Sequence, residues 1–571
     1  MKLSVQIILI LLVVSCRTPQ NALNSYSVNP YRYTTNKNII AQKGAVVSAH
    51  PLASKIGLGV MKNGGNAIDA AIATQLALAV VYPNAGNIGG GGFMVARLAN
   101  GQTVALDYRE TAPIAAHRDM YLDANGNVLE GKSVNGHLAS GVPGTVAGLF
   151  ESMKYAKLSF KQLIQPAIEL AEKGFVITER EAASFNNLQD ELNEDNTVPS
   201  AFQSKLQWKA GDTLIQQDLA NTLKRIRDQG IKGFYEGKTA QLIIEEMKRG
   251  QGLITLADLK NYKAKWRTPH IFPYKGYTIV SMPMPSSGGA LLHQMLKMLE
   301  DYPLPSYGFL SPQAAQLMIE VERRAYADRA EYMGDADFYK VPLEKITSDV
   351  YLKNRMKDYQ PGIAGNSLQI KPGILALKES EQTTHLSVID AEGNAVAVTT
   401  TLNNSYGSKT VVGSAGFFLN DEMDDFSVKP GVPNIYGAVG GEANAIVPGK
   451  RMLSSMTPTI VLQNGKPFLV VGTPGGTTIP TSVLQTIVNI VDFEMGTEDA
   501  VYKPKFHHQW LPDQVDIEKT FPQAAKEALA KMGYKMVERG TIGRTEVIRV
   551  LPDGKFEAVA DNRGEDGAEG W

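Results

Sequence analysis

Cysteine is almost missing from this sequence: Cys16 is the only one among 571 residues. A chain with one cysteine cannot form an internal disulfide, so packing and hydrogen bonds must hold its fold. A charge imbalance is missing too, because 57 basic and 58 acidic side chains nearly cancel. This excludes a bulk attraction to nucleic acid or to acidic membranes. What remains is the composition of a soluble globular protein, with the length of about two to four domains.

The sequence also lacks an apolar run long enough to span a membrane. The apolar run over residues 5–14, which follows Lys2, has the length of a signal-peptide core. It ends in Val13-Val14-Ser15-Cys16, which resembles the lipobox of bacterial lipoproteins. We therefore expect a signal peptide over 1–15, lipidation of Cys16 and a flexible tether over 16–38. The protein would be exported to the periplasm and would touch the membrane only through its lipid. The alternative is an ordinary signal peptide cut nearby.

Helix and strand signals alternate in the next part of the chain. Residues 67–81 are small and apolar nearly all round, which predicts a buried helix, and Asn66 can cap its start. A glycine-rich run over 86–93 follows. A dinucleotide-binding loop needs a strand before it and a helix after it, whereas here a helix precedes and a strand follows. We therefore interpret these glycines as sites of close backbone packing.

Residues 141–360 are predicted to be mainly helical, and the part after 383 is predicted to be rich in antiparallel strands. Turns at Gly393, Asn464-Gly465 and Asp553-Gly554 each separate two apolar runs, which is typical of β-hairpins. Together these regions predict an α+β fold. The charged side chains near 313–333 are most simply explained as a charged helix face with i,i+4 pairs; they are Glu322, Arg323, Arg324, Asp328 and Arg329.

The stretch Gln382-Thr383-Thr384-His385 stands between an irregular polar segment and the first of these hairpins. A threonine hydroxyl alone is a poor nucleophile. A chain cut before Thr383 would give it a free α-amine with a pKa of about 8, which can serve as its own general base. The sequence therefore favours self-cleavage between Gln382 and Thr383. The structural alternative is simple, because β-branched pairs are common where strands begin.

Further clusters supply other parts of such a site. Residues 399–403 end the second strand of the hairpin and carry hydroxyls and an amide toward Thr383. The segment 420–426 is strongly acidic and requires a cation to offset its repulsion. Residues 451–458 offer paired hydroxyls, and the glycine amides within 471–478 follow a strand and suit an oxyanion hole.

Each cluster taken alone has a structural explanation. The acidic segment 420–426 could be a solvated turn or a calcium-binding loop, although it lacks the spacing of an EF-hand. Arg109 follows the predicted strand 104–107 and could be a surface salt-bridge residue. It could equally bind a carboxylate with both arms of its guanidinium.

As a set, the segments 382–388, 420–426, 450–456, 472–476 and 506–510 closely resemble γ-glutamyltranspeptidases. The likeness runs from about Ala45 to the C-terminus and includes residues 107–113. It implies an N-terminal-nucleophile hydrolase fold, a four-layer αββα sandwich made as an inactive precursor. Self-cleavage would give a large chain over 39–382 and a small catalytic chain over 383–571, which stay together as a heterodimer. It implies no cofactor and no metal.

The same resemblance assigns roles to individual residues. Thr383 matches the nucleophile that takes the γ-glutamyl group as an ester, and Thr401 the hydroxyl that orients it. Leu386 stands where an aromatic residue is often found, a departure expected to be neutral. The other matches are Gly475 and Gly476 in the oxyanion hole, Arg109, Ser454 and Ser455 at the α-carboxylate, Asn403, Glu422 and Asp425 at the α-amino group, and Tyr436 in a lid loop over 429–437.

The implied activity is cleavage of glutathione and other γ-glutamyl compounds, with transfer of the acyl group to water, amino acids or peptides. A glutamyl head is a zwitterion, so it needs a guanidinium at one end and carboxylates at the other. Three alternatives stay open. They are a glutaryl or cephalosporin acylase, whose substrates lack the α-amino group, a poly-γ-glutamate-processing relative, and a surface lipoprotein with a dead site that stays uncut.

Overall fold

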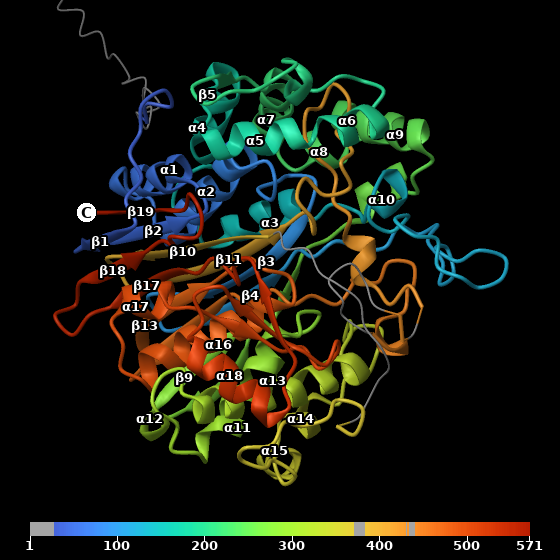
Figure 1. Ribbon diagram of the computed structural model, residues 1–571. Helices are drawn as coiled ribbons and strands as arrows, with labels where there is room; N and C mark the ends of the chain where they lie inside the picture. The colour runs from blue at the N-terminus through green and yellow to red at the C-terminus, as the bar shows by residue number, and fades with distance from the viewer. Residues whose placement is uncertain (1–27, 371–382, 430, 433–439) are drawn as a thin grey trace, which may run out of the picture.

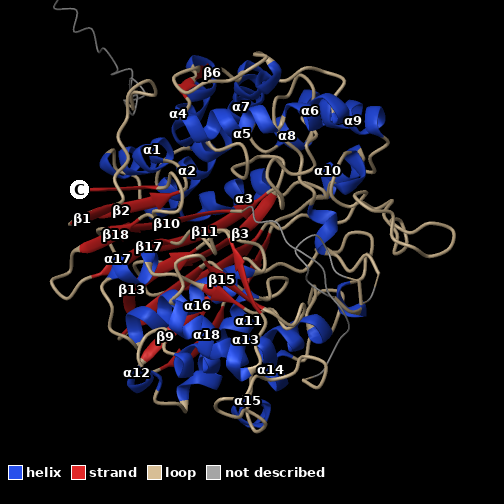
Figure 2. Ribbon diagram, viewed as in Figure 1, coloured by secondary structure: helices blue, strands red, loops and turns tan. Residues whose placement is uncertain are grey.

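The computed structural model describes residues 28–370, 383–429, 431–432 and 440–571. The predicted lipidation, cleavage and lid positions Cys16, Gln382 and Tyr436 therefore lie outside the described residues. Two seven-stranded antiparallel sheets pack face to face at the centre, with helices over both outer faces (Figure 1; Figure 2). This arrangement confirms the predicted four-layer αββα sandwich.

Both sheets take strands from before and after Thr383, so the two predicted chains are interleaved. In order across the first sheet, the strands are β1 (Asn38–Ala41), β18 (Phe556–Val559), β17 (Glu546–Val550), β13 (Lys466–Gly472), β12 (Thr459–Gln463), β9 (Tyr277–Ser281) and β8 (His270–Tyr274). In order across the second, they are β19 (Gly567–Gly570), β2 (Gly44–Ser48), β10 (Thr384–Asp390), β11 (Ala395–Thr401), β3 (Gly91–Arg97), β4 (Thr103–Asp107) and β7 (Lys265–Arg267).

Helices from the first part of the chain lie on the side of the second sheet, where α1, α2 and α3 contact its strands. They are α1 (Pro51–Lys62), α2 (Ala67–Val81), α3 (Thr145–Ser152), α4 (Phe160–Lys173), α5 (Glu179–Asn187), α6 (Gln189–Asp195), α7 (Gln217–Gln229), α8 (Lys232–Tyr235), α9 (Gly237–Gly250) and α10 (Leu256–Asn261).

Later helices lie on the side of the first sheet, where α11, α16 and α17 contact its strands. They are α11 (Gly288–Glu300), α12 (Leu304–Tyr307), α13 (Pro312–Tyr332), α14 (Leu343–Ile346), α15 (Asp349–Arg355), α16 (Thr478–Val491), α17 (Thr497–Tyr502) and α18 (Gln523–Met532). Two minor sheets join β5 (Phe175–Val176) to β6 (Thr213–Leu214), and β14 (Phe506–His507), β15 (Val515–Glu518) and β16 (Met536–Arg539) to one another.

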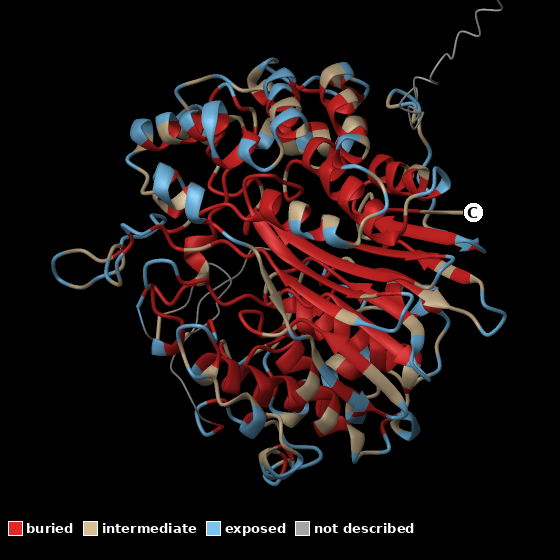
Figure 3. Ribbon diagram, turned by 180° about the vertical axis from the view of Figure 1, so that it is seen from behind, coloured by how far each residue is buried: buried red, intermediate tan, exposed pale blue. Residues whose placement is uncertain are grey.

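Strand β10 forms where the alternating pattern after Thr383 predicted a strand. Both faces of β10 are buried, the polar one as well as the apolar one (Figure 3). Leu386 and Val388 belong to the core shared with α1 and α2. The polar alternates point between the sheets, where the Ser387 hydroxyl donates to the Glu546 carbonyl at 3.0 Å. His385 Nδ1 lies 2.9 Å from Thr399 Oγ1. Buried polar groups are tolerated here because they satisfy one another.

The local predictions on both sides of Thr383 agree with the structure. Helix α2 spans the predicted residues 67–81, is buried on all sides, and is capped by Asn66 in a capping box. The three predicted hairpins are present as β10–β11, β12–β13 and β17–β18. The glycine-rich run is also explained by packing, because a Cβ at Gly90 would lie 2.1 Å from the Thr401 carbonyl oxygen.

The start of the described chain is attached to the body of the protein. Within the stretch predicted to be a tether, Tyr33 donates to the Val176 carbonyl at 3.2 Å. Lys37 donates to the carbonyls of Asp561, Gly564 and Asp566. Among the described residues, no helix combines the length and the apolar character that crossing a bilayer requires.

Candidate active site

The predicted site residues come together at the adjoining ends of β10 and β11. One small cavity is lined by Thr383, Thr401, Asn403, Asp425, Gly476, Arg109, Ser454 and Ser455. These residues come from segments spread over more than half of the chain, and the two central strands and the loops around them bring them together. Glu422 lies against Arg109, and Gly475 lines an adjoining cavity that also reaches Thr383.

Thr383 immediately precedes β10 and is 4% exposed. Thr401, the last residue of β11, fixes the turn opposite it, because its hydroxyl oxygen accepts a hydrogen bond from the Asn403 backbone N–H at 2.8 Å. Asn403 has a left-handed φ of 78°, a conformation that costs energy for a residue other than glycine. Its amide donates to the Asp421 carbonyl at 3.1 Å, which holds this strained turn beside Thr383.

Arg109 is the electrostatic centre of the cavity and is 1% exposed. Its Nη1 lies 2.5 Å from Glu422 and 3.7 Å from Glu110, and its Nη2 pairs with Asp425. Glu422 and Asp425 belong to the short 3-10 helix Glu422–Asp425. Arg109 is therefore the cation that offsets the repulsion within the acidic segment 420–426. The site thus holds a buried guanidinium and buried carboxylates side by side.

Burial changes the charge of this cluster. It raises the pKa of Glu110 to about 8, although the nearby Arg109 opposes the shift. Burial also raises the pKa of Glu422 well above its ordinary value and that of Asp425 in the same direction, again against the pull of Arg109. At neutral pH, Glu110 therefore favours its protonated form, and the cluster does not carry the full negative charge that its residue types would give.

Ser454 and Ser455 are held by the loop that opens α11. The Ser287 N–H and hydroxyl both donate to the Ser454 carbonyl, at 2.8 and 2.7 Å. Arg329 in α13 donates through Nη2 to the Ser455 hydroxyl at 3.1 Å and through Nε to Ser287 at 3.0 Å. Arg329 also lines the cavity, which places a second guanidinium at the predicted α-carboxylate end.

The sequence missed Arg329, because it was interpreted as part of a charged helix face. The i,i+3 and i,i+4 pairs do form, with Glu320 bonded to Arg323 at 3.2 Å and to Arg324 at 2.5 Å. That face is buried, however: all five predicted charged residues are below 9% exposed. The interpretation as an ordinary charged face was wrong in this respect, since nothing in a periodic charge pattern distinguishes a solvated face from one covered by other segments.

The loop at Gly475 and Gly476 leads from β13 into α16 with φ values of 137° and 53°. The Gly475 carbonyl accepts hydrogen bonds from the Thr478 N–H at 2.9 Å and the Thr478 hydroxyl at 2.7 Å. In a trans peptide the next N–H points the opposite way. The Gly476 N–H therefore points away from the helix start, as an oxyanion donor would have to do.

His385, the nearest histidine to Thr383 along the chain, is a poor candidate for the base. Its ring lies between the sheets, where a Cβ at Gly472 would approach it to 2.2 Å. Burial lowers the pKa of His385 to about 3, so it is a weak proton acceptor at neutral pH. A cleaved Thr383 would then have to rely on its own α-amine.

A threonine placed at the start of a central strand, in a sandwich of two antiparallel sheets covered by helices, defines an N-terminal-nucleophile hydrolase architecture. Residues 53–571 match the γ-glutamyltranspeptidase family. The chain belongs to this family.

Similar proteins agree with this assignment. The chain is 47% identical over 529 residues to a glutathione hydrolase proenzyme of Escherichia coli, covering 92% of this chain and 91% of that protein. It is 46% identical over 529 residues to one of Pseudomonas aeruginosa, covering 91% and 93%. Among solved structures, a cephalosporin acylase from Bacillus halodurans superposes with a TM-score of 0.82 at 26% identity, covering 95% of this chain and 98% of that one.

Proposed function

We propose that this protein is a self-processing γ-glutamyltransferase that hydrolyses glutathione and related γ-glutamyl compounds. The observation that carries the proposal is the cavity at Thr383, which holds a buried guanidinium, buried carboxylates and paired serines within reach of one hydroxyl. This set matches a glutamyl head, whose carboxylate and ammonium must both be paired once they leave water.

The proposed mechanism starts with cleavage between Gln382 and Thr383, which frees the Thr383 α-amine. The amine takes the proton of the Thr383 hydroxyl as Oγ attacks the γ-carbonyl carbon of the donor. The Gly475 and Gly476 amides stabilise the oxyanion, and the donor C–N bond breaks as the leaving amine receives the proton. Water or an amine then attacks the ester and restores Thr383.

In the bound donor, the α-carboxylate would lie against Arg109, Ser454 and Ser455. The α-ammonium would lie at Asp425, Glu422 and Asn403. The pairing of Arg109 with Asp425 and Glu422 supports this division. The carboxylate of a bound zwitterion would pair with Arg109 and its ammonium with the two acids, so neither side of the existing ion pair would be left buried and unpaired.

The competing function is an acylase, since one similar structure is a cephalosporin acylase. The carboxylates at Asp425 and Glu422 favour a substrate with an α-ammonium group, which a glutaryl group lacks. The test compares hydrolysis of γ-glutamyl-p-nitroanilide and glutaryl-p-nitroanilide by the purified protein. We expect kcat/KM to favour the γ-glutamyl compound by roughly 100-fold or more, the size of two charge-assisted hydrogen bonds. Equal values would contradict the proposal and favour the acylase.

Processing can be tested separately from turnover. The native precursor of 62.0 kDa should give two bands on a denaturing gel, and the smaller one should begin with Thr383 on N-terminal sequencing. The Thr383→Ala variant should stay as one inactive band. Thr384→Ala is the matched control, because the Thr384 hydroxyl makes no hydrogen bond within the described part of the chain. Continued cleavage of Thr383→Ala would show that another residue is the nucleophile, and an uncut native chain would favour the binding lipoprotein.

We also propose export through the segment 1–15, lipidation at Cys16, and a lid over 429–437 in which Tyr436 screens the cavity. The lipobox sequence supports the first two. Growth with a labelled fatty acid should label the native protein and leave Cys16→Ser unlabelled. An unlabelled native protein would leave an ordinary signal peptide as the explanation.

A further inference from the structure

A buried segment behind the cavity at Thr383 has no place in the proposed binding of the donor. It is the segment 506–510, which the family resemblance includes and which begins with β14 and packs against α16. All five of its side chains are 9% exposed or less. Buried polar side chains need hydrogen-bond partners, and the partner of Gln509 lies at the cavity.

Gln509 contacts the residue that follows the two proposed oxyanion glycines. The Thr477 hydroxyl donates to Gln509 Oε1 at 2.5 Å. Thr477 caps the start of α16 and lines the cavity together with Thr383 and Gly476. The described residues that line this cavity include Thr477 but not Gln509. Gln509 would therefore act on the cavity through Thr477.

The amide of Gln509 is oriented by its own neighbours. Its Nε2 donates to the Leu511 carbonyl at 3.3 Å, so its Oε1 faces Thr477. His507 Nε2 lies 2.9 Å from the same Oε1, and His507 Nδ1 lies 2.8 Å from Thr481 Oγ1. Burial lowers the pKa of His507 to about 3, so the ring is neutral at neutral pH. A neutral ring can donate from Nε2 to Gln509 and accept at Nδ1 from the Thr481 hydroxyl, which satisfies both nitrogens.

The two ends of this segment have contacts of their own. At one end, Gln485 in α16 donates through Nε2 to the Phe506 carbonyl at 2.7 Å. At the other end, Trp510 Nε1 donates to the carbonyls of Ser367 and Ile370, both at 2.9 Å. The segment should therefore stay in place when the glutamine side chain between these ends is changed.

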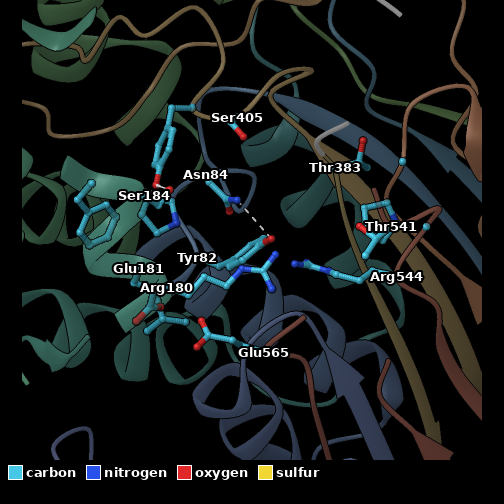
Figure 4. A pocket seen from close by; sticks show the side chains of 17 residues that line it. Tyr82, Asn84, Arg180, Glu181, Ser184, Thr383, Ser405, Thr541, Arg544 and Glu565 are labelled. Atoms are coloured by element: carbon cyan, nitrogen blue, oxygen red, sulfur yellow. Dashed lines mark hydrogen bonds between the residues drawn. The ribbon is translucent and has the colours of Figure 1, made fainter. Parts of the chain in front are cut away.

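The loop over 473–477 stands between two cavities. Gly475 lines the wider one, which Figure 4 shows beside Thr383 and Arg544. Gly476 lines the smaller one. Both glycines have positive φ values, and glycine itself restricts the backbone little. The direction of the loop's amides must therefore be set by contacts at its ends.

Both ends of this loop are anchored. Before the glycines, the Arg544 N–H donates to Thr473 Oγ1 at 2.7 Å. After them, Thr477 is held twice, because its hydroxyl donates to Gln509 and its carbonyl accepts from the Tyr326 hydroxyl. Such anchors matter for catalysis, since oxyanion donors must reach the position of the developing charge and a misplacement of about 1 Å can cost roughly 100-fold in rate.

We propose that Gln509 is a positioning residue for the oxyanion amides, an inference that rests on the proposed function. It holds the Thr477 hydroxyl, and with it the peptide that joins Gly476 to Thr477, while His507 keeps the glutamine amide in its orientation. Loss of this hydrogen bond should loosen the loop without removing any group that binds the γ-glutamyl head. The expected effect is therefore on kcat, with little change in the KM of the donor.

The test measures kcat and KM for γ-glutamyl-p-nitroanilide, with activity normalised to the processed fraction on a gel. Gln509→Met keeps the length of the side chain and removes the acceptor, and Thr477→Val removes the donor at nearly the same shape. Each should lower kcat by roughly 10-fold and change KM by less than about threefold. Because both act through one hydrogen bond, the double variant should also lose roughly 10-fold, and not roughly 100-fold. Thr477→Ser keeps the hydroxyl and should retain kcat within about threefold.

Gln485→Met is the matched control. It removes two buried hydrogen bonds from the same strand β14, one to the Phe506 carbonyl at 2.7 Å and one from the Phe506 N–H at 3.2 Å. The glutamine of the control is thus buried and bonded to β14, but its printed partners there are not part of the loop over 473–477. Gln485→Met should lower the stability and leave kcat within about twofold.

The outcomes separate the two proposals. If the native protein releases no p-nitroaniline, the proposed function is wrong and this inference falls with it. If the native protein is active but Gln509→Met keeps kcat within about twofold, or the double variant loses roughly 100-fold, Gln509 does not position the loop while the proposed function stands. An equal loss of kcat in Gln485→Met would assign the effect to β14 as a whole and would also overturn the inference. If Gln509→Met does not fold, Thr477→Val and Thr477→Ser test the same hydrogen bond, and equal kcat values for these two would overturn it.

Discussion

Replacing Arg109 separates two proposed functions of its guanidinium, which are to stabilise the buried carboxylates and to bind the α-carboxylate of the donor. Arg109→Met removes the charge and the hydrogen-bond donors but keeps an unbranched apolar stem of similar width. In the native protein this side chain pairs with Glu422 and Asp425 and is 1% exposed. Arg109→Lys keeps the charge at the same place but cannot hold a carboxylate with two parallel N–H donors.

The expected magnitudes follow from this environment. Removing one partner of a buried ion pair costs about 3–5 kcal/mol, because the remaining charge is left without compensation. The cost of Arg109→Met should lie toward the lower end, since Glu110 already favours its protonated form at neutral pH. Two lost charge-assisted hydrogen bonds of about 1.5–3 kcal/mol each should raise the donor KM by roughly 100-fold or more.

Arg109→Met and Arg109→Lys should therefore differ in stability more than in donor KM. We expect Arg109→Lys to recover most of the lost stability and little of the lost donor affinity, because stability depends on the charge and binding depends on the two-armed geometry. Thermal unfolding measures the first and the KM for γ-glutamyl-p-nitroanilide the second, with activity normalised to the processed fraction on a gel. Ser455→Ala is a useful comparison, since it removes one neutral hydroxyl from the same end of the cavity.

Two outcomes would refute this reasoning. If Arg109→Met leaves the donor KM within a factor of three of native, Arg109 does not bind the α-carboxylate. If Arg109→Lys restores the KM but not the stability, charge alone binds the donor and the assigned geometry is wrong. In the second case Arg329, which also lines the cavity, would be the better candidate for the two-armed contact.

Two further variants test other parts of the site. Glu110→Gln should flatten the pH dependence of stability. The folded pKa of Glu110 is raised from 4.5 to about 8, so its contribution is fully present below 4.5 and is lost at about 1.4 kcal/mol per pH unit as pH rises to 8. Denaturant unfolding of the uncut Thr383→Ala chain, with and without Glu110→Gln, measures this slope, and parallel curves would contradict it. Gly475→Ala should lower kcat by roughly 10–100-fold with a smaller change in KM, because its φ is 137° and its Cβ would lie 2.4 Å from Thr478 Oγ1. A change in KM alone would contradict the oxyanion assignment.

What the sequence predicted well was local. The hairpins at Gly393, Asn464-Gly465 and Asp553-Gly554 depend on a turn and two neighbouring runs, and all three are present. The buried helix over 67–81 depends on its own composition and cap. The site residues that form family motifs were predicted in the same way, because each motif is a short continuous segment, and their roles stay predictions.

What the sequence did not predict depends on contacts between distant segments. β2 is a central strand beside β10, yet its residues 44–48 carry no hairpin partner nearby, since β19 at the far end of the chain completes its pairing. Arg329, Arg180 and Arg544 carry no motif. Their place beside Thr383 follows only from how α13, α5 and the C-terminal segment fold around the two sheets.

The interleaving of strands also explains how a chain cut before Thr383 could keep its site. Thr384 is the first residue of β10, so a break before Thr383 removes none of the hydrogen bonds that pair this strand with β2 and β11. β10 lies between β2, from before the cut, and β11, from after it, and β1 pairs with β18 in the other sheet. Arg109 from the first part likewise pairs with Glu422 and Asp425 from the second. Separating the two products would break both sheets and leave buried charges unpaired, so the cavity should persist after cleavage without a covalent link.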